Sequence, residues 1–132
     1  MGELKTAYEE IEEALDINVL KLGYIPDDMV LIEVELSENK AILAFEYDKK
    51  IVHFIQERLN KETSIGVGSD RLRTEESIVN KWLDKDIYLE AETYENGSAG
   101  FSGTVNIGDA RYSIFGQLPK EEMILILERL FF

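Results

Sequence analysis

Few side chains of this chain could act as a nucleophile, a proton shuttle or a soft metal ligand, because it holds one histidine and no cysteine. His53 lies between Ile51 and Ile55 in an alternating run that is typical of a strand. A general acid–base histidine needs an orienting carboxylate and a nucleophile or metal, and the neighbouring residues supply neither. One histidine also cannot form a centre with several histidine ligands. We therefore interpret His53 as a structural or merely exposed side chain.

Carboxylates are abundant and gather in pairs, at Glu9-Glu10, Glu12-Glu13, Asp27-Asp28, Asp84 with Asp86, and Glu121-Glu122. Calcium needs six or more oxygen ligands converging from a defined loop. The stretch Asp84-Lys85-Asp86 places a lysine between two carboxylates and has no glycine turn after it, so we predict no metal site there. Two carboxylates from distant strands could form a hydrolase site of the glycosidase type, and this alternative stays open.

The glycines of Ile65-Gly66-Val67-Gly68-Ser69-Asp70 resemble half of a phosphate-binding loop. No Gly-Lys-Ser/Thr follows them, and the serines of the chain lie outside any Gly-x-Ser-x-Gly elbow. We predict a mobile loop over residues 60–70. The sequence thus leads us to expect no catalytic residue, no cofactor and no metal, and hence a protein that is not an enzyme.

Acidic residues outnumber basic ones by 27 to 14, which gives a net charge of −13. Such a surface repels the phosphates of nucleic acids and anionic lipids, and no basic stripe is visible, so we expect no nucleic-acid binding. No run of about 18 apolar residues exists, so no segment is expected to insert into a membrane. The start of the chain lacks the apolar core of a signal peptide. We expect either a cytoplasmic protein or a fragment that begins after an anchor.

The 132 residues are predicted to form one domain of the α+β class. Leu4, Tyr8, Ile11 and Leu15 recur at helical spacing. Alternating runs with short links between them indicate antiparallel hairpins, within residues 30–36, 41–47, 51–56, 87–92, 99–107 and 112–116. The stretch from Thr74 to Leu83 fits a short helix or an irregular strand. Glycines at 100 and 103 indicate a bulge or a close approach of the backbone.

A second helix is predicted with Pro119 as its first residue, with Glu121 and Glu122 in its first turn and its end at Leu130. Its core stripe is Met123, Ile126, Leu127 and Leu130. Four apolar side chains fall off this stripe: Ile124, Leu125, Phe131 and Phe132. They could be buried between the sheet and the first helix, or they could form a surface for a protein partner, an apolar ligand or a second copy in a homodimer.

Together these elements predict a curved, six-stranded antiparallel sheet with the N-terminal and C-terminal helices packed on one face. The order is helix, three strands, loop, three strands, helix. No internal repeat, low-complexity tract or linker divides residues 1–132.

Two stretches resemble a known bacterial family. The opening pattern of the family, Tyr-x-Pro-x-Gly-Tyr, is similar to Leu22-Gly-Tyr24-Ile-Pro26-Asp-Asp-Met-Val-Leu31. Its closing pattern, Tyr-x-Ile-x-Gly-x-Leu-x-x-Glu-Glu, is similar to Tyr112-Ser-Ile114-Phe-Gly116-Gln-Leu118-Pro-Lys-Glu121-Glu122. The family is domain of unknown function 4367, and the resemblance covers about residues 4–131. The chain departs from it at Asp28-Met29, where a glycine and an aromatic residue are usual, and at Gly103-Thr104, where a tryptophan is often found.

The resemblance implies the extracytoplasmic part of a membrane-anchored protein of a Gram-positive bacterium. Such domains look distantly similar to lipoprotein-carrier and sigma-factor-regulatory domains, and no activity or functional residue is assigned to the family. We therefore predict a non-catalytic binding or sensory module that engages a protein partner or an apolar ligand. A cytoplasmic or phage-type interaction protein with the same scaffold is the alternative.

Overall fold

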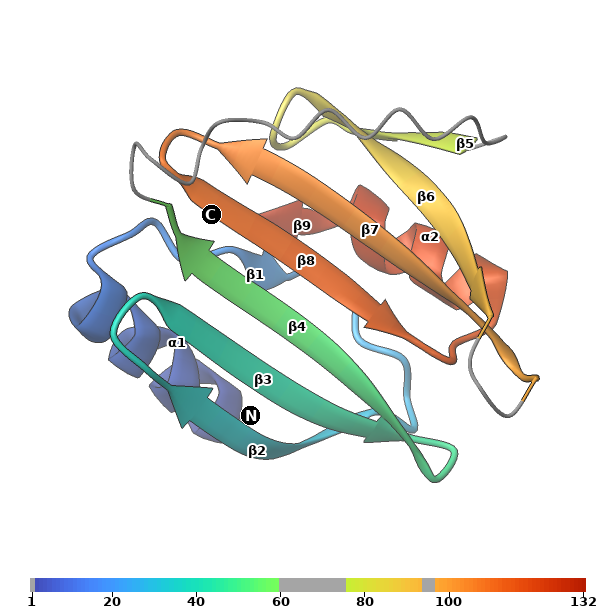
Figure 1. The fold of residues 1–132 in the computed structure, drawn as a ribbon, viewed down its shortest axis with the longest axis horizontal. Coiled ribbons are helices and arrows are strands. Elements are labelled where there is room, and N and C mark those ends of the chain that lie inside the picture. Colours follow the sequence, from blue (N-terminus) through green and yellow to red (C-terminus); the bar gives the residue numbers. More distant parts are fainter. Residues whose placement is uncertain (1, 60–75, 94–96) are drawn as a thin grey trace.

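The structure, a computed structural model, describes residues 2–59, 76–93 and 97–132. Within this part, seven antiparallel strands form one sheet in the order β2-β3-β4-β8-β7-β6-β5 (Figure 1). Their bounds are β2 (Val30–Leu36), β3 (Lys40–Tyr47), β4 (Lys50–Arg58), β5 (Glu76–Asn80), β6 (Lys85–Thr93), β7 (Ala99–Ile107) and β8 (Ala110–Gly116). The α+β class and the antiparallel sheet are confirmed, but the predicted number of six strands is wrong. The loop expected over residues 60–70 lies outside the described residues.

The extra strand is β5. It lies in the stretch from Thr74 to Leu83, for which the sequence allowed either a short helix or an irregular strand. It pairs with β6, with Ile78 opposite Ile87. Ile78 and Asn80 both face the interior and are buried. Because one of these two inward positions is polar, the apolar alternation that identifies a strand is broken here.

Two groups of hairpins make up the sheet: β2-β3-β4 and β5-β6-β7-β8, joined by the pairing of β4 with β8. Asp48 and Lys49 connect β3 to β4 with φ angles of 51° and 65°. These positive angles are those of a two-residue type I′ turn, whose twist matches that of the flanking strands. The predicted hairpin between these two strands is confirmed.

The first strand of the sheet departs from its predicted alternation. The pairing of β2 with β3 shifts by one residue between Leu31 and Glu33. Ile32 is the extra residue of this bulge and is 51% exposed, while Leu31 and Val34 pack against the core. A bulge of this kind twists an outer strand and so hinders its pairing with another chain.

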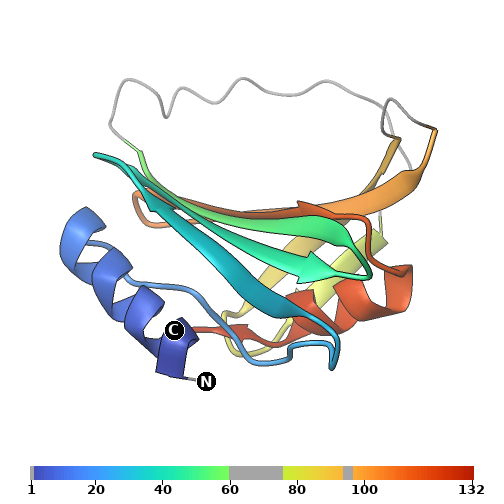
Figure 2. The same cartoon turned by 90° about the horizontal axis from the view of Figure 1, so that it is seen from below.

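Both helices, α1 (Gly2–Leu15) and α2 (Lys120–Glu128), lie on the same side of the sheet (Figure 2). We call the sheet face toward the helices the inner face and the opposite one the outer face. Helix α1 buries Leu4, Ile11 and Leu15 at the predicted helical spacing. Helix α2 carries the predicted pair of glutamates in its first turn, but Pro119 is its N-cap and not, as predicted, its first residue, because its ψ of 146° is that of extended backbone.

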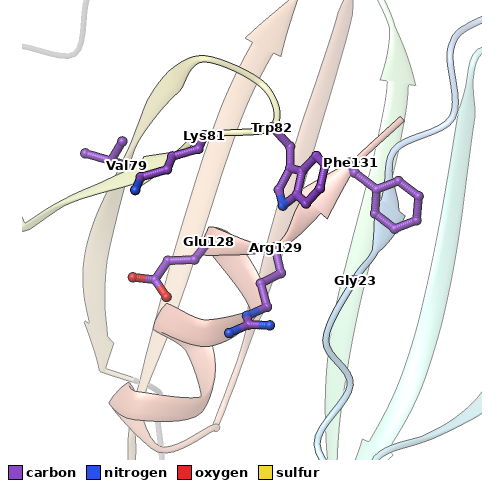
Figure 3. A pocket seen from close by; sticks show the side chains of 7 residues that line it. All are labelled: Gly23, Val79, Lys81, Trp82, Glu128, Arg129 and Phe131. Atoms are coloured by element: carbon purple, nitrogen blue, oxygen red, sulfur yellow. The ribbon is translucent and has the colours of Figure 1, made fainter.

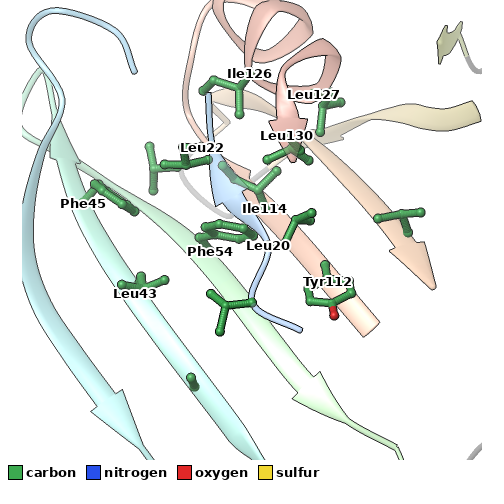
Figure 4. Close-up of a cluster of buried hydrophobic side chains, with 14 of the residues drawn as sticks. Leu20, Leu22, Leu43, Phe45, Phe54, Tyr112, Ile114, Ile126, Leu127 and Leu130 are labelled. Atoms are coloured by element: carbon green, nitrogen blue, oxygen red, sulfur yellow. The ribbon is translucent and has the colours of Figure 1, made fainter. Parts of the chain in front are cut away.

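The core lies between the inner face and the two helices, and it includes Leu43, Phe45, Phe54, Ile114, Ile126 and Leu127 (Figure 4). Gly103 lies under α2, where an added Cβ would come within 2.7 Å of both methyl carbons of Leu127. The predicted close approach at this glycine is confirmed. A larger side chain at this position would push α2 off the sheet.

A small two-stranded ribbon, β1 (Lys21–Leu22) with β9 (Leu130–Phe131), completes the inner layer. The second helix therefore ends at Glu128, so its predicted continuation to Leu130 is wrong. The amide of Gly23 donates to the carbonyl of Arg129 at 2.9 Å and extends the ribbon. Because the last residues pair with another strand, their backbone groups are satisfied outside the helix.

Candidate functional site

An open groove of about 690 Å³ lies where the β5–β6 turn faces the end of α2 and the ribbon. We call it the Trp82 groove. Its lining side chains come from three parts of the chain, as Figure 3 shows: Gly23, Val79, Lys81, Trp82, Glu128, Arg129 and Phe131. The volume lies within the range of sites that bind small ligands or a few side chains of a partner.

Aromatic surface is unusually accessible in this groove. Trp82, the single tryptophan of the chain, is 77% exposed, and Phe131 is 36% exposed. Val79 adds another exposed apolar side chain beside them. Tryptophan combines a large contact area with few rotatable bonds, which is why it is enriched in the centres of binding interfaces.

Cations line this groove together with the aromatic rings although the whole chain is strongly acidic. Lys81 and Arg129 line the Trp82 groove together with a single carboxylate, that of Glu128. The ammonium of Lys21 lies 5.8 Å from the centre of the Phe131 ring, within the range of a cation–π contact. The groove therefore offers apolar contact together with an excess of cations.

One buried amide links the two walls of the groove. Asn80, which is fully buried, donates through Nδ2 to the carbonyls of Leu127 at 2.8 Å and Leu130 at 3.0 Å. Its Oδ1 accepts the amide of Leu83 at 2.9 Å. The turn that carries Trp82 and the segment that carries Phe131 are thus bonded to the same side chain. Hydrogen bonds of buried groups are costly to break, so Asn80 fixes the width of the groove.

A second groove of about 610 Å³ runs between α1 and the ribbon, and we call it the helix groove. Phe132 lines it, 43% exposed, and packs edge-on against Tyr112 with ring centres 5.8 Å apart. Its charges are balanced: Lys5, Lys21, Glu9 and Glu12. Because its cations and carboxylates are equal in number, this groove lacks the excess of cations found in the Trp82 groove.

Two tyrosines, the half-buried Tyr8 and the buried Tyr112, support the ribbon and the segment that leads into it. The hydroxyl oxygen of Tyr8 accepts the amide of Leu22 at 2.9 Å, and the hydroxyl of Tyr112 donates to the carbonyl of Asn18 at 2.6 Å. Burial raises the pKa of each tyrosine to about 12. Both hydroxyls therefore stay neutral at ordinary pH and serve as hydrogen-bonding groups.

The four predicted surface residues do not form one surface. Phe131 lines the Trp82 groove, whereas Phe132 lines the helix groove on the other side of the ribbon. Ile124 is partly buried and packs against the core, and Leu125 is half-buried. The separation of the two phenylalanines follows from strand geometry, because successive side chains of an extended segment point to opposite sides.

The remaining candidates lie elsewhere. His53 is on the outer face, where its ring stacks on Phe115 with centres 5.2 Å apart. In the part of the chain that the structure describes, no group of three or more histidine, aspartate or glutamate side chains is placed to hold a metal ion. None of the described helices is both long enough and apolar enough to cross a bilayer.

Sequence reasoning missed the tryptophan and the cations that define the first groove. Trp82 stood in the undecided stretch, and Lys81 and Arg129 looked like ordinary members of a mixed, acidic surface. The one available signal was the contrast between a lone tryptophan and its polar surroundings in Asn80-Lys81-Trp82-Leu83-Asp84.

The structure also joins the two motifs that carry the family resemblance. The hydroxyl of Tyr24, in the opening motif, donates to Oε1 of Glu122, in the closing motif, at 2.7 Å. This hydrogen bond is the main cause that raises the pKa of Tyr24. The motifs therefore tie the segment before β2 to the first turn of α2.

The comparisons with known proteins give a family and no relative. The family described as a domain of unknown function (DUF4367) matches residues 19–130, which leaves α1 outside the matched region. No curated protein and no solved structure matches the chain. Because the match covers well over half of the 132 residues, the chain belongs to the DUF4367 family.

Proposed function

We propose that this domain is a non-catalytic binding module and that the Trp82 groove is its binding site. The observation that carries the proposal is the 77% exposure of the single tryptophan beside a partly exposed phenylalanine. Leaving large aromatic surfaces in water is unfavourable, and a binding partner that covers them recovers that free energy. Of the predicted surface residues, Phe131 belongs to this site.

A built scaffold supports the proposal. Asn80 bonds both walls of the groove, and the ribbon that carries Phe131 is itself held by the hydrogen bond from Gly23 to Arg129. A site of this kind needs little reorganisation when a partner arrives, which lowers the entropic cost of binding. Trp82 and Arg129 are also of the residue types that dominate binding energy in protein interfaces.

Site-specific photocrosslinking in the protein's own cells tests the proposal even while the partner is unidentified. A photoreactive phenylalanine analogue replaces Trp82 in the full-length protein, and a second version carries it at Tyr88. Tyr88 is a suitable control because it is 55% exposed on the outer face. We expect a covalent adduct at position 82 and none at position 88. Adducts at 88 alone, or at neither position, would contradict the proposal.

We also propose that the module acts on the outer side of a bacterial membrane, as an anchored receptor or sensor domain. The support is the sequence resemblance to this family, which implies the extracytoplasmic part of a membrane-anchored protein. Protease added to intact cells without their wall should degrade the domain. Protection equal to that of a cytoplasmic marker would instead favour the cytoplasmic interaction protein.

A further inference from the structure

We propose that the occupant of the Trp82 groove is an extended acidic segment of a protein partner that also carries apolar side chains. The inference rests on the proposed binding function and names the chemistry of its ligand. In the complex, apolar side chains of the segment cover Trp82 and Phe131. Its carboxylates pair with the cations around them.

The charge argument starts from the contrast between the groove and the whole molecule. The chain carries a net charge of −13, which repels acidic partners in general. The groove lining nevertheless holds Lys81 and Arg129 against one carboxylate, and Lys21 lies close to Phe131. Neither groove-lining cation forms an ion pair with another described residue. One ammonium and one guanidinium group thus remain for carboxylates of a partner.

The distribution of these cations favours an extended segment over a small apolar acid. Lys81 lies in the turn after β5, and Arg129 lies directly after α2, so the two groove-lining cations come from different elements. A molecule with one carboxylate can pair with only one of the two cations that line the groove, whereas a peptide can present a carboxylate to each. The groove is also open rather than enclosed, since Trp82 remains 77% exposed. Ligand sites for small molecules usually enclose most of the ligand surface.

The test uses four probes and the fluorescence of Trp82, which reports on this groove alone because the chain has no other tryptophan. The first probe is a synthetic peptide that alternates glutamate and leucine. The second replaces each glutamate by lysine, the third replaces each leucine by serine, and the fourth is laurate. We expect the first peptide to shift the tryptophan emission to shorter wavelength and to bind at least about tenfold more tightly than the others. Its affinity should fall as salt is added.

A charge reversal identifies the groups responsible. In the double variant Lys81→Glu/Arg129→Glu, we expect the preference to invert, so that the lysine–leucine peptide binds and the glutamate–leucine peptide does not. The matched control is Lys49→Glu/Lys50→Glu, which changes the last residue of the β3–β4 turn and the first residue of β4. This control changes the net charge by the same amount as Lys81→Glu/Arg129→Glu. Its two residues are exposed and line a different surface. We expect this control to bind the acidic peptide as the native protein does.

Three results would overturn the inference: laurate binding as tightly as the acidic peptide, equal binding of the lysine peptide by the native protein, or an equal loss in the control. The photocrosslink at position 82 separates the two proposals. If it persists in cells after Lys81→Glu/Arg129→Glu, the groove binds a partner but not an acidic one. If it never forms, the binding function itself is wrong.

Discussion

At the scale of single residues, Asn80 is the group on which the groove depends most. Its three hydrogen bonds join the β5–β6 turn to the end of α2 and to β9. A sequence offers little sign of such a role, because asparagine is usually a residue of exposed turns. Its burial is a consequence of tertiary packing, which brings two carbonyls and one amide around a position on the inner face.

We predict that Asn80→Ala lowers the free energy of unfolding by about 2–4 kcal/mol, because it leaves two buried carbonyls and one amide without partners. Urea denaturation measures the change. Asn106→Ala, on an exposed position of β7, is the control and should stay within about 0.5 kcal/mol of the native protein. Equal stability of the two variants would show that Asn80 does not hold the groove together.

Ionisation of the half-buried Tyr8 lowers the stability of the fold at alkaline pH. In the unfolded chain a tyrosine ionises near its usual pKa of about 10, whereas burial raises the pKa of Tyr8 in the folded protein to about 12. Between these values the folded state binds the proton more tightly, so the stability that this proton contributes is complete below about pH 10 and falls as the pH rises toward about 12.

We expect Tyr8→Phe to reduce the steepness of this alkaline loss, because the variant has no hydroxyl to ionise there. Its stability at neutral pH should be lower, since the amide of Leu22 loses its acceptor. Thermal unfolding from about pH 8 to about pH 12 measures both effects, with Tyr88→Phe on the exposed outer face as the control. An unchanged slope in Tyr8→Phe would mean that this hydroxyl does not titrate as its burial implies.

At the scale of elements, the ribbon β1–β9 determines where the Trp82 groove and the helix groove lie. It separates the Trp82 groove from the helix groove and directs Phe131 and Phe132 to opposite sides. Gly23 allows this arrangement, because a Cβ there would collide with the carbonyl oxygen of Arg129. The close contact is between two backbones, which a side-chain rotation cannot relieve.

We predict that Gly23→Ala separates the ribbon strands and destabilises the protein by more than Gly108→Ala. Gly108 is the informative comparison, since it has a φ of 62° and open space around it. Its substitution should cost only the strain of a left-handed backbone, about 1–2 kcal/mol. Chemical denaturation ranks the two variants. A smaller loss for Gly23→Ala would contradict the close approach.

Elements with a clear period were predictable, and short or interrupted ones were not. The alternation of Ile51, His53 and Ile55 identified β4, and the spacing of Leu4, Ile11 and Leu15 identified α1. A two-residue strand such as β9 has no period to detect. In that segment, the pairing with β1 overrides the apolar run that predicted a longer helix.

At the scale of the whole molecule, the two hairpin groups meet at β4 and β8 and present one continuous inner face to both helices. The class of this architecture could be predicted from the order of helices and strands. The Trp82 groove could not, because it is assembled from Gly23, Lys81 and Arg129, which are far apart in sequence. Only the long-range packing of the ribbon against the β5–β6 turn places them together.

The most direct measurement of the central claim is an NMR titration of the isotopically labelled protein with the glutamate–leucine peptide. The chain has one tryptophan, so one indole N–H signal reports Trp82 unambiguously. We expect that signal to move first, together with the amides of Lys81, Arg129 and Phe131, while those of the helix groove and the outer face stay in place. Shifts confined to the helix groove or the outer face, with the indole signal unmoved, would contradict the assignment of the Trp82 groove as the binding site.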